Sequence, residues 1–327
     1  MEEIILAVDL GGTNVRIATV NHQGKILDRL SFLTEVSRGK ERIMEDILSR
    51  IRRFLRGFPV EEFEVIGGGF GIPGAIALDR GIVSQSPNLP GWEGFDIRSR
   101  LRKGLRMPII VENDANAFSL GEGWMGAARG VKDFCCLTLG TGVGGGIVLH
   151  GDIWHGTEGK AGEIGHMVID VDGPPCQCGS RGCLEVFASG SAIRRMAIEA
   201  IEGDEKTDLV ERCGGEIKRI TAKTVHESAR GGDRLSRGIF QRMGTYLGVG
   251  LANLVNLLNL ELMVIGGRVS EAWDLFIDPA REELEKRAVG SMGKEVRVER
   301  ARCGDDAGIL GAAYLVKREF ENHKRRR

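Results

Sequence analysis

The sequence predicts a two-domain α/β protein, and three observations support this prediction. The chain has 327 residues, about twice the length of a typical domain of ~150 residues. Its apolar fraction of 42% is enough for a sizeable core. A unit of strand, glycine turn and strand occurs twice, with Asp9 of the first copy and Thr138 of the second 129 residues apart. We therefore expect two related α/β domains, each presenting a glycine hairpin to a common cleft.

The composition excludes several classes of protein. The 45 basic and 46 acidic residues nearly cancel, which argues against a nucleic-acid partner. No apolar stretch reaches the roughly 18 residues that a membrane span needs, and the start, Met1-Glu2-Glu3, lacks the basic region of a signal peptide. We expect a cytoplasmic protein with no membrane partner.

Glycine is unusually frequent, with 48 residues, about twice the usual share. Only 8 prolines and no Gly-X-Y period accompany them, so neither a collagen nor a disordered chain fits. The glycines come in short bursts between apolar runs. Such bursts are typical of loops whose backbone approaches a ligand closely.

The first part of the chain alternates strands with polar strand ends. An apolar run leads into Asp9, and another leads into Glu112-Asn113-Asp114. Residues 41–56 place apolar side chains at helical spacing, which predicts an amphipathic helix on a sheet. The elements expected here are strands at 4–9, 15–20, 63–66 and 108–111 and the helix at 41–56, with Gly67-Gly68-Gly69 following the third strand.

The second part repeats the opening pattern and then becomes mainly helical. The expected strands are 134–139, 147–149 and 262–265, with a turn at 140–146. The expected helices are 187–202, 221–230, 233–259, 274–288 and about 305–321. Gly244, Gly248 and Gly250 inside one of these helices indicate close helix packing. The basic tail, Lys324 to Arg327, is expected to be solvated and disordered.

Two glycine loops, 11–14 and 140–146, are candidates for phosphate binding. A phosphate needs several backbone N–H groups directed at it, and glycine lets a tight turn present them. A dinucleotide fingerprint fits less well because strand residues, not a helix, follow both loops. No P-loop motif occurs. Ordinary tight hairpins remain the alternative, although Asp9, Thr13 and Thr141 accompany the loops.

A histidine and three cysteines have the spacing of a metal site. His166, Cys176, Cys178 and Cys183 follow the pattern H-x9-C-x-C-x4-C, which supplies four ligands for a tetrahedral zinc. A closed site of this kind leaves no position for water, so the zinc would be structural and would fix the loop that bears Glu163 and Glu185. Reduced thiols without a metal are the alternative.

With these residues in hand, the chain resembles the ROK family (repressors, open reading frames and sugar kinases) over essentially its whole length, and most of all the bacterial ROK glucokinases. The segments that carry the resemblance are Asp9-Leu-Gly-Gly-Thr13, Glu112-Asn-Asp-Ala-Asn-Ala117, Leu139-Gly-Thr-Gly-Val-Gly-Gly-Gly146, Glu163-Ile-Gly-His166 and Cys176-Gln-Cys-Gly-Ser-Arg-Gly-Cys183. Together these motifs are specific, whereas any one glycine loop is weak.

The resemblance implies a two-domain actin/hexokinase-like (ribonuclease H-like) fold with a central cleft. It implies a first domain of residues 1–117 plus about 305–327 and a second domain of 118–304 that carries the zinc loop. It also implies a homo-oligomer, a dimer or tetramer. The implied activity is phosphorylation of glucose in glycolysis, with ATP, Mg²⁺ and a structural Zn²⁺ as cofactors.

The resemblance also implies a role for each site residue. Asp114 would be the general base, and capping of the helix that begins near Ala115 is the alternative for it. The sugar would meet Asn88, Asn113, Asp114, Glu163, His166, Glu185 and the backbone of Gly74. ATP would meet Asp9, Gly11, Gly12, Thr13, Asn14, Gly140, Thr141, Gly142, Gly144, Gly266 and Gly267, with Asp9 in outer-sphere contact with the metal or, alternatively, only a turn former. His166 would use one ring nitrogen for zinc and the other for a sugar hydroxyl.

Other functions remain open. The run Ser86-Pro87-Asn88-Leu89-Pro90-Gly91-Trp92 is similar to the glucokinase sugar loop, but N-acetylmannosamine kinases share the zinc and glycine motifs. A kinase for N-acetylmannosamine, fructose or a broad set of hexoses is therefore the alternative within the enzyme class. A sugar-binding ROK regulator is the alternative of another class; only three residues precede the first strand, whereas the family's repressors carry an N-terminal winged helix-turn-helix.

Overall fold

The computed structural model describes residues 1–59, 61–86 and 88–326, which form two compact units. The first unit comprises Met1–Val131, Gly146–Gly162 and Arg302–Arg327. The second comprises Lys132–Gly145 and Glu163–Ala301. No helix among the described residues is long and apolar enough to cross a membrane.

The first unit is built on a five-stranded sheet of order β3-β2-β1-β4-β7. β1 pairs in parallel with β4 and β4 with β7, whereas β1, β2 and β3 form an antiparallel meander. The strands are β1 (Glu2–Leu10), β2 (Asn14–Asn21), β3 (Ile26–Leu33), β4 (Phe63–Ile72) and β7 (Ile109–Asn113). A separate two-stranded sheet contains β5 (Ala75–Ala77) and β6 (Ile82–Gln85).

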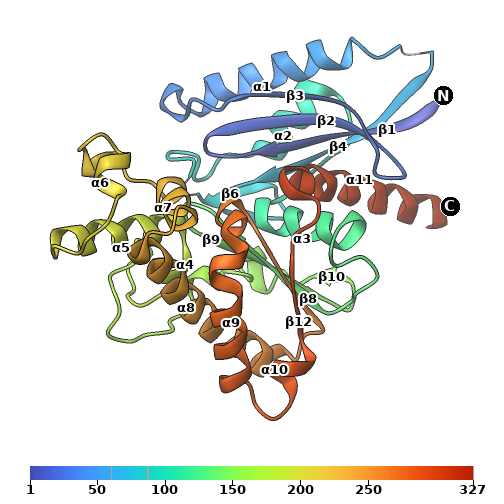
Figure 1. Cartoon of the computed structure of the whole chain (residues 1–327). Helices are drawn as coiled ribbons and strands as arrows, with labels where there is room; N and C mark the ends of the chain where they lie inside the picture. The colour runs from blue at the N-terminus through green and yellow to red at the C-terminus, as the bar shows by residue number, and fades with distance from the viewer. Residues whose placement is uncertain (60, 87, 327) are drawn as a thin grey trace. The chain divides into compact units, whose positions relative to one another are not determined.

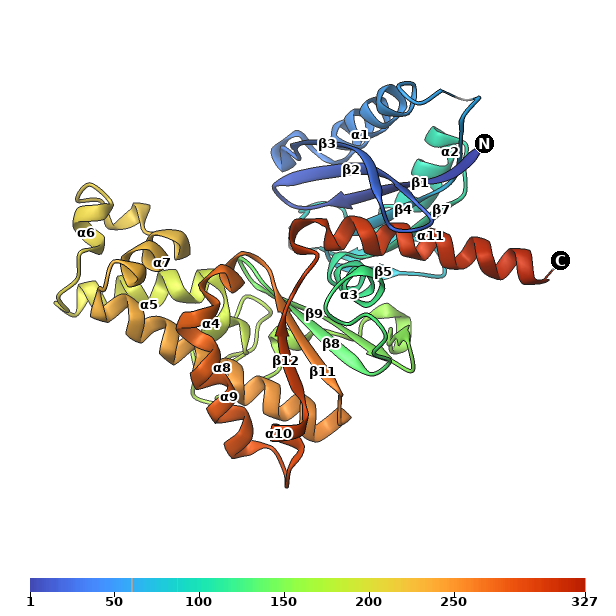
Figure 2. The same ribbon diagram turned by 45° about the vertical axis from the view of Figure 1, so that its right-hand side comes forward.

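Helices cover both faces of this sheet (Figures 1 and 2). The helices are α1 (Lys40–Leu55) and α2 (Ile97–Leu105) on one face and α3 (Asp114–Met125) and α11 (Ala307–Arg326) on the other. Side chains of β1 alternate between the two cores: Leu6 and Val8 pack with α1, whereas Ile5 and Ala7 pack with α11. This period of two is why the apolar run of the sequence reads as a buried strand.

Glycines let α3 and α11 approach their neighbours at backbone distance. A Cβ on Gly69 of β4 would lie 1.9 Å from the carbonyl oxygen of Ala312 in α11. Where α3 and α11 meet, a Cβ on Gly311 would lie 1.6 Å from the carbonyl oxygen of Ala117. Any side chain at these positions would push the helices apart, so the glycines are required by packing.

The second unit contains a sheet of order β9-β8-β11-β12, in which β8, β11 and β12 are parallel. Its strands are β8 (Phe134–Leu139), β9 (Val143–Leu149), β11 (Leu262–Gly266) and β12 (Arg297–Arg300). β9 continues into the first unit, where it pairs with β10 (Asp152–Ile153). The helices are α4 (Glu185–Ala188), α5 (Gly190–Glu202), α6 (Leu209–Arg212), α7 (Ala222–Arg230), α8 (Arg234–Leu258), α9 (Trp273–Arg287) and α10 (Met292–Glu295).

Short 3-10 helices complete the chain, at η1 (Val36–Arg38), η2 (Thr157–Gly159), η3 (Ile164–His166), η4 (Ile217–Arg219), η5 (Arg268–Ala272) and η6 (Gly304–Asp306). The expectation of close packing at the glycines of α8 is confirmed. A Cβ on Gly244 would lie 2.3 Å from the carbonyl oxygen of Phe276, and one on Gly248 would lie 2.4 Å from that of Ala280, both in α9.

Four local predictions were wrong. The strand expected to end at Ile66 continues through Gly67, Gly68 and Gly69 in β4, and α11 packs directly on the first and third of these glycines. The predicted turn at 140–146 ends at Gly142 because β9 begins at Val143. The C-terminal helix does not end near residue 321 but continues to Arg326. Lys324 donates to Glu3 (Nζ to Oε1, 2.9 Å), and cations are favoured at a helix C-terminus, so the basic tail is helical through its described residues.

Candidate active site and metal centre

The carboxyl ends of three parallel strands place two candidate residues on one edge of the first sheet. The register pairs Asp9 of β1 with Gly71 of β4 and Ile72 with Asn113 of β7. A Cβ on Gly71 would lie 3.8 Å from Asp9 Oδ1 and 3.7 Å from the Cα of Asp114. Asp9 and Asp114, 105 positions apart in the chain, therefore both lie next to this glycine.

Asn113 caps the helix that begins at Asp114. Asn113 Oδ1 accepts hydrogen bonds from the N–H groups of Ala115 (2.9 Å) and Asn116 (3.0 Å). Asn113 Nδ2 donates to the carbonyl oxygen of Gly74 at 3.0 Å. The capping role considered for Asp114 thus belongs to its neighbour. Asp114 Oδ1 accepts from the N–H of Ala115 at 2.9 Å, which orients its carboxylate at the first turn of α3.

Glu112 and His155 are polar residues to which the sequence assigned no role. Glu112 is 3% exposed; its Oε1 accepts from the N–H of Asn113 and from Asn116 Nδ2, each at 2.9 Å. Its Oε2 lies 2.8 Å from His155 Nε2. A glutamate at the end of a buried strand was the available signal for Glu112, but nothing in the sequence pairs it with His155, 43 positions away.

The first glycine loop is fixed from both sides. The N–H of Gly11 donates to the carbonyl oxygen of Asn14 at 2.9 Å, and Thr34 Oγ1 donates to that of Gly11 at 2.6 Å. The N–H of Thr34 donates to the carbonyl oxygen of Thr13 at 2.9 Å. A Cβ on Gly12 would lie 3.2 Å from the carbonyl oxygen of Asn88. The structure therefore brings the loop at 11–14 against the exposed Asn88, whose neighbour Pro87 lies outside the described residues.

Asp9 lies in a charged and largely buried setting. Burial raises the pKa of its carboxyl, and the nearby guanidinium of Arg16 partly offsets this rise. Arg16 Nη1 lies 3.4 Å from Asp9 Oδ2, and its Nη2 lies 3.3 Å from Asp305 Oδ2. A Cβ on Gly308 would lie 3.1 Å from Asp9 Cγ, so the carboxylate reaches the first turn of α11.

In the second unit, two segments with candidate nucleotide residues lie against their neighbours in the fold. The carbonyl oxygen of Gly140 accepts from the N–H of Gly190 at 2.7 Å, at the start of α5. Gly267, at a φ of 81°, packs so closely on the end of β8 that a Cβ would lie 2.5 Å from the carbonyl oxygen of Leu139. Thr141 and Gly266 flank these contacts, whereas Gly144 lies in β9.

Glu185 lies between this hairpin and the metal cluster. Its Oε2 accepts from the N–H of Val143 at 2.9 Å, and a Cβ on Gly142 would lie 2.2 Å from the same oxygen. Its Oε1 lies 4.0 Å from Cys176 Sγ. A residue predicted to bind sugar therefore also holds the second glycine loop.

The four predicted metal ligands come together. The ligand atoms of His166, Cys176, Cys178 and Cys183 all lie within 4.8 Å of one another. Cys178 and Cys183 have their sulfurs 3.7 Å apart, and Cys176 Sγ lies 3.6 Å from His166 Nδ1. A tetrahedral zinc with Zn–S of ~2.3 Å and Zn–N of ~2.0 Å requires about 3.8 Å between two sulfurs and about 3.5 Å between sulfur and nitrogen. These two pairs therefore have the spacing of zinc ligands.

The two ring nitrogens of His166 face different groups, one the thiol cluster and the other the carboxylate of Glu163. Nε2 lies 4.0 Å from Glu163 Oε2, while Nδ1 lies at the thiol cluster. Burial raises the pKa of the Cys183 thiol to about 12, so a bound cation is needed to keep this sulfur as a thiolate ligand at neutral pH.

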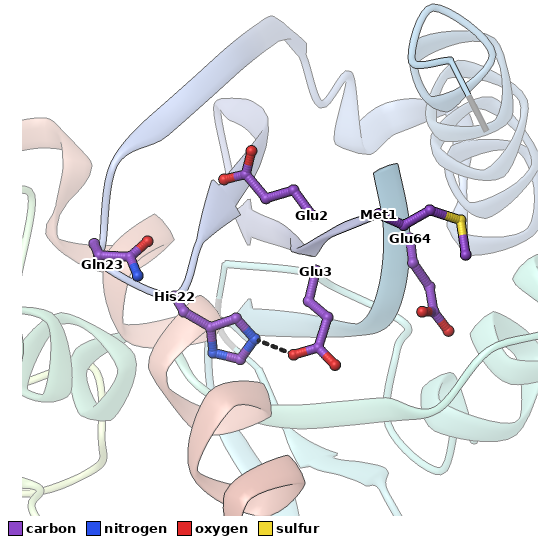
Figure 3. A pocket seen from close by; sticks show the side chains of 6 residues that line it. All are labelled: Met1, Glu2, Glu3, His22, Gln23 and Glu64. Atoms are coloured by element: carbon purple, nitrogen blue, oxygen red, sulfur yellow. Dashed lines mark ion pairs between the residues drawn. The ribbon is translucent and has the colours of Figure 1, made fainter. Parts of the chain in front are cut away.

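A pocket of about 450 Å³ lies elsewhere on the first unit, at the start of β1 (Figure 3). It is lined by Met1, Glu2, Glu3, His22, Gln23 and Glu64. His22 Nε2 lies 3.0 Å from Glu3 Oε2, and hydrogen bonding from Lys324 is the main cause that lowers the pKa of Glu3. The pocket contains none of the predicted site residues, and an ion-pair cluster accounts for its charge.

Comparison with known proteins decides the family. The ROK family model matches residues 5–319. The chain belongs to the ROK family. A glucokinase of Halalkalibacterium halodurans is 39% identical to this ROK chain over 320 residues, covering 96% of the chain and 95% of the relative. A xylose repressor of Caldicellulosiruptor bescii is 29% identical and is covered over 77% of its length.

A solved structure agrees with this ROK membership. The structure of a ROK family glucokinase from Streptomyces griseus, in complex with glucose and AMPPNP, aligns with a TM-score of 0.83 at 32% identity. The alignment covers 96% of this chain and 99% of that one. The predicted resemblance to bacterial ROK glucokinases and the actin/hexokinase-like fold are confirmed.

Proposed function

We propose that this ROK protein is a glucokinase. It is an ATP-dependent hexose kinase, and the reaction transfers the γ-phosphoryl group of ATP to glucose to give glucose 6-phosphate. The observation that carries the proposal is similarity to glucokinases over nearly the whole of both chains, one of them solved with glucose and AMPPNP.

Asp114 is the proposed general base. Phosphoryl transfer to an alcohol needs little covalent chemistry from the protein beyond a carboxylate that takes the hydroxyl proton. The N–H of Ala115 holds Asp114 Oδ1, so the carboxylate has one orientation at the start of α3. Asn113 reinforces this orientation because both of its polar side-chain atoms are engaged by the backbone.

The nucleotide is assigned to the two glycine loops. Loops 11–14 and 140–144 would hold the phosphates with backbone N–H groups other than those of Gly11 and Val143, which donate to Asn14 and Glu185, and Gly266 and Gly267 would lie near the adenosine. Mg²⁺ supplies charge neutralisation on the phosphates when it is bound. Asp9 fits a role at the metal's water shell because its carboxylate shares the sheet edge with Asp114.

The sugar is assigned to the polar residues that the family motifs imply. Asn88, Asn113, Glu163, His166, Glu185 and the backbone of Gly74 would meet its hydroxyl groups. Carboxylates suit this task because they accept hydrogen bonds from hydroxyl groups, and side-chain amides can both accept and donate. A structural zinc on His166, Cys176, Cys178 and Cys183 would fix the segment that carries three of these residues.

The decisive test is ADP release on addition of glucose, ATP and magnesium. A kinase releases ADP in proportion to sugar, whereas a sugar-binding regulator, the alternative of another class, binds sugar without turnover. Asp114→Asn should lower kcat by about 10²–10⁴-fold and leave the glucose Kd nearly unchanged. The matched control is Asp79→Asn, whose side chain is 76% exposed. A near-normal kcat in Asp114→Asn would remove the assignment of the base.

A substrate panel separates glucose from the alternative substrates. Values of kcat/KM for glucose, mannose, fructose, N-acetylglucosamine and N-acetylmannosamine should be highest for glucose. A site that hydrogen-bonds each hydroxyl discriminates strongly between epimers, so the differences should be large. A higher value for N-acetylmannosamine or fructose would favour that kinase instead. The cytoplasmic location, the role in glycolysis and the homo-oligomer stay predictions.

A further inference from the structure

We propose that Glu112 and His155 form a positioning pair that holds the segment leading to Glu163 against the turn that presents Asp114. The proposal rests on the proposed function, because it assigns sugar binding to Glu163 and catalysis to Asp114. The pair is separate from the metal cluster, which consists of His166, Cys176, Cys178 and Cys183.

The buried carboxylate of Glu112 explains why the pair is strong. Glu112 is 3% exposed, and removing a carboxylate from water is unfavourable unless hydrogen bonds and an opposite charge replace the water. A carboxylate only accepts hydrogen bonds, so the 2.8 Å contact to His155 requires that Nε2 of the imidazole carries a proton. The N–H of Asn113, Asn116 Nδ2 and His155 Nε2 all lie at hydrogen-bond distance from this carboxylate, between 2.8 and 2.9 Å.

One carboxylate thereby connects two segments. Through Oε1, Glu112 fixes the N–H of Asn113 and the side chain of Asn116, which flank Asp114 at the start of α3. Through Oε2, it fixes His155, eight positions before Glu163. A displacement of His155 would remove one of the three hydrogen-bond donors to Glu112. Glu112 in turn holds Asn113 and Asn116, which flank Asp114.

The segment after His155 has a second anchor on the same unit. The N–H of Ala161 donates to the carbonyl oxygen of His155 at 3.0 Å, which closes the segment into a compact loop. A Cβ on Gly159 would lie 2.6 Å from the carbonyl oxygen of Ile76, so η2 rests directly on β5. Gly156, Gly159 and Gly162 all have positive φ. Glycine loses more conformational freedom on folding than other residues do. The contact of His155 with Glu112 therefore helps to hold this glycine-rich segment in one conformation.

His155→Ala tests the pair. The variant removes the donor at Glu112 Oε2, and we expect the sugar KM to rise about tenfold or more, because small displacements of binding groups have effects of this size. The KM for ATP should stay within about twofold. His155→Gln should restore most of the loss, because the amide nitrogen of glutamine also donates. His323→Ala, at an exposed histidine of α11, is the control.

A second readout does not depend on catalysis. Hydrogen exchange of peptides covering 154–163 and 112–116 should accelerate in His155→Ala and return towards the parent rate in His155→Gln. Sugar affinity should fall in His155→Ala and recover in His155→Gln. It can be measured by the fluorescence of Trp154, which is 56% exposed and adjacent to His155. If the parent binds sugar without turnover, the kinase proposal fails, while exchange and affinity still decide the role of the pair.

Two results would overturn the inference. One is exchange and sugar affinity in His155→Ala that match the parent. The other is a His155→Ala variant in which the KM for sugar, the KM for ATP and Tm all change together, and in which His155→Gln restores none of these values. The second result would assign the pair to general stability alone.

Discussion

The fully buried carboxylate of Glu122 permits a prediction about the stability of the first unit. Its side chain is 0% exposed. Oε2 accepts from the N–H groups of Ala127 (2.8 Å) and Arg302 (3.1 Å), and Oε1 accepts from the N–H of Cys303 (2.8 Å). These bonds join the end of α3 to the segment where the chain re-enters the first unit before α11.

The change Glu122→Gln replaces one acceptor oxygen with a donor. In the less damaging orientation the new amide group faces the N–H of Cys303, and one buried donor loses its acceptor. An unsatisfied buried donor costs about 1–3 kcal/mol, and the two remaining bonds lose their charge assistance. We therefore expect the free energy of unfolding to fall by about 2–4 kcal/mol. Glu122→Ala, which leaves three donors unsatisfied, should cost more.

Urea titration followed by circular dichroism measures this change, with the first transition assigned to the first unit by hydrogen exchange. Glu282→Gln, at an exposed glutamate of α9, is the matched control and should change stability by less than ~0.5 kcal/mol. If Glu122→Gln is as stable as the control, or if Glu122→Ala is no worse than Glu122→Gln, the three hydrogen bonds do not carry the stability assigned to them.

Three further predictions follow from the site. Metal analysis should find about one zinc per chain. Cys178→Ser should lower both the zinc content and Tm, whereas the control Cys213→Ala should keep the zinc. An unchanged zinc content in Cys178→Ser would contradict the metal cluster. Glu185→Gln should raise the KM for ATP as well as for sugar, because Glu185 holds the N–H of Val143, whereas Asn88→Ala should affect sugar alone; an unchanged ATP KM would limit Glu185 to the sugar. Burial raises the pKa of Asp9 above 3.8, so between 3.8 and the raised value the native state binds more protons than the unfolded chain and loses stability as pH rises. Asp9→Asn should therefore gain stability over the parent across that window and lose turnover, and a stability difference that is independent of pH would contradict this account.

The features that the sequence predicted well depend on short-range patterns. The strand, turn and strand around Asp9 follow from apolar residues that face two cores, and the zinc ligands follow from spacing within 18 positions. Helices with an apolar face, such as α1 and α8, were placed within one residue of each observed end. In these cases one segment contains the physical information.

The features that the sequence did not predict depend on partners far along the chain. The strand before Gly67–Gly69 was expected to end at Ile66, and only the contacts with α11 show why β4 needs glycines at positions 67 and 69. The edge strand β3 has few buried side chains, so its pattern gave no signal. Glu112 and Glu122 acquire their roles from His155 and from the backbone at 302–303, and neither partner is visible in local sequence.

The position of α11 in the chain has a consequence for folding during synthesis. The second unit ends at Ala301, so its whole sequence has been made before the ribosome adds α11. The first unit begins at Met1 but lacks one helix until the last residues emerge. Until then Ile5 and Ala7 on the nascent chain lack the helix that packs against them. The part of the protein that is translated first is therefore the part that finishes folding last.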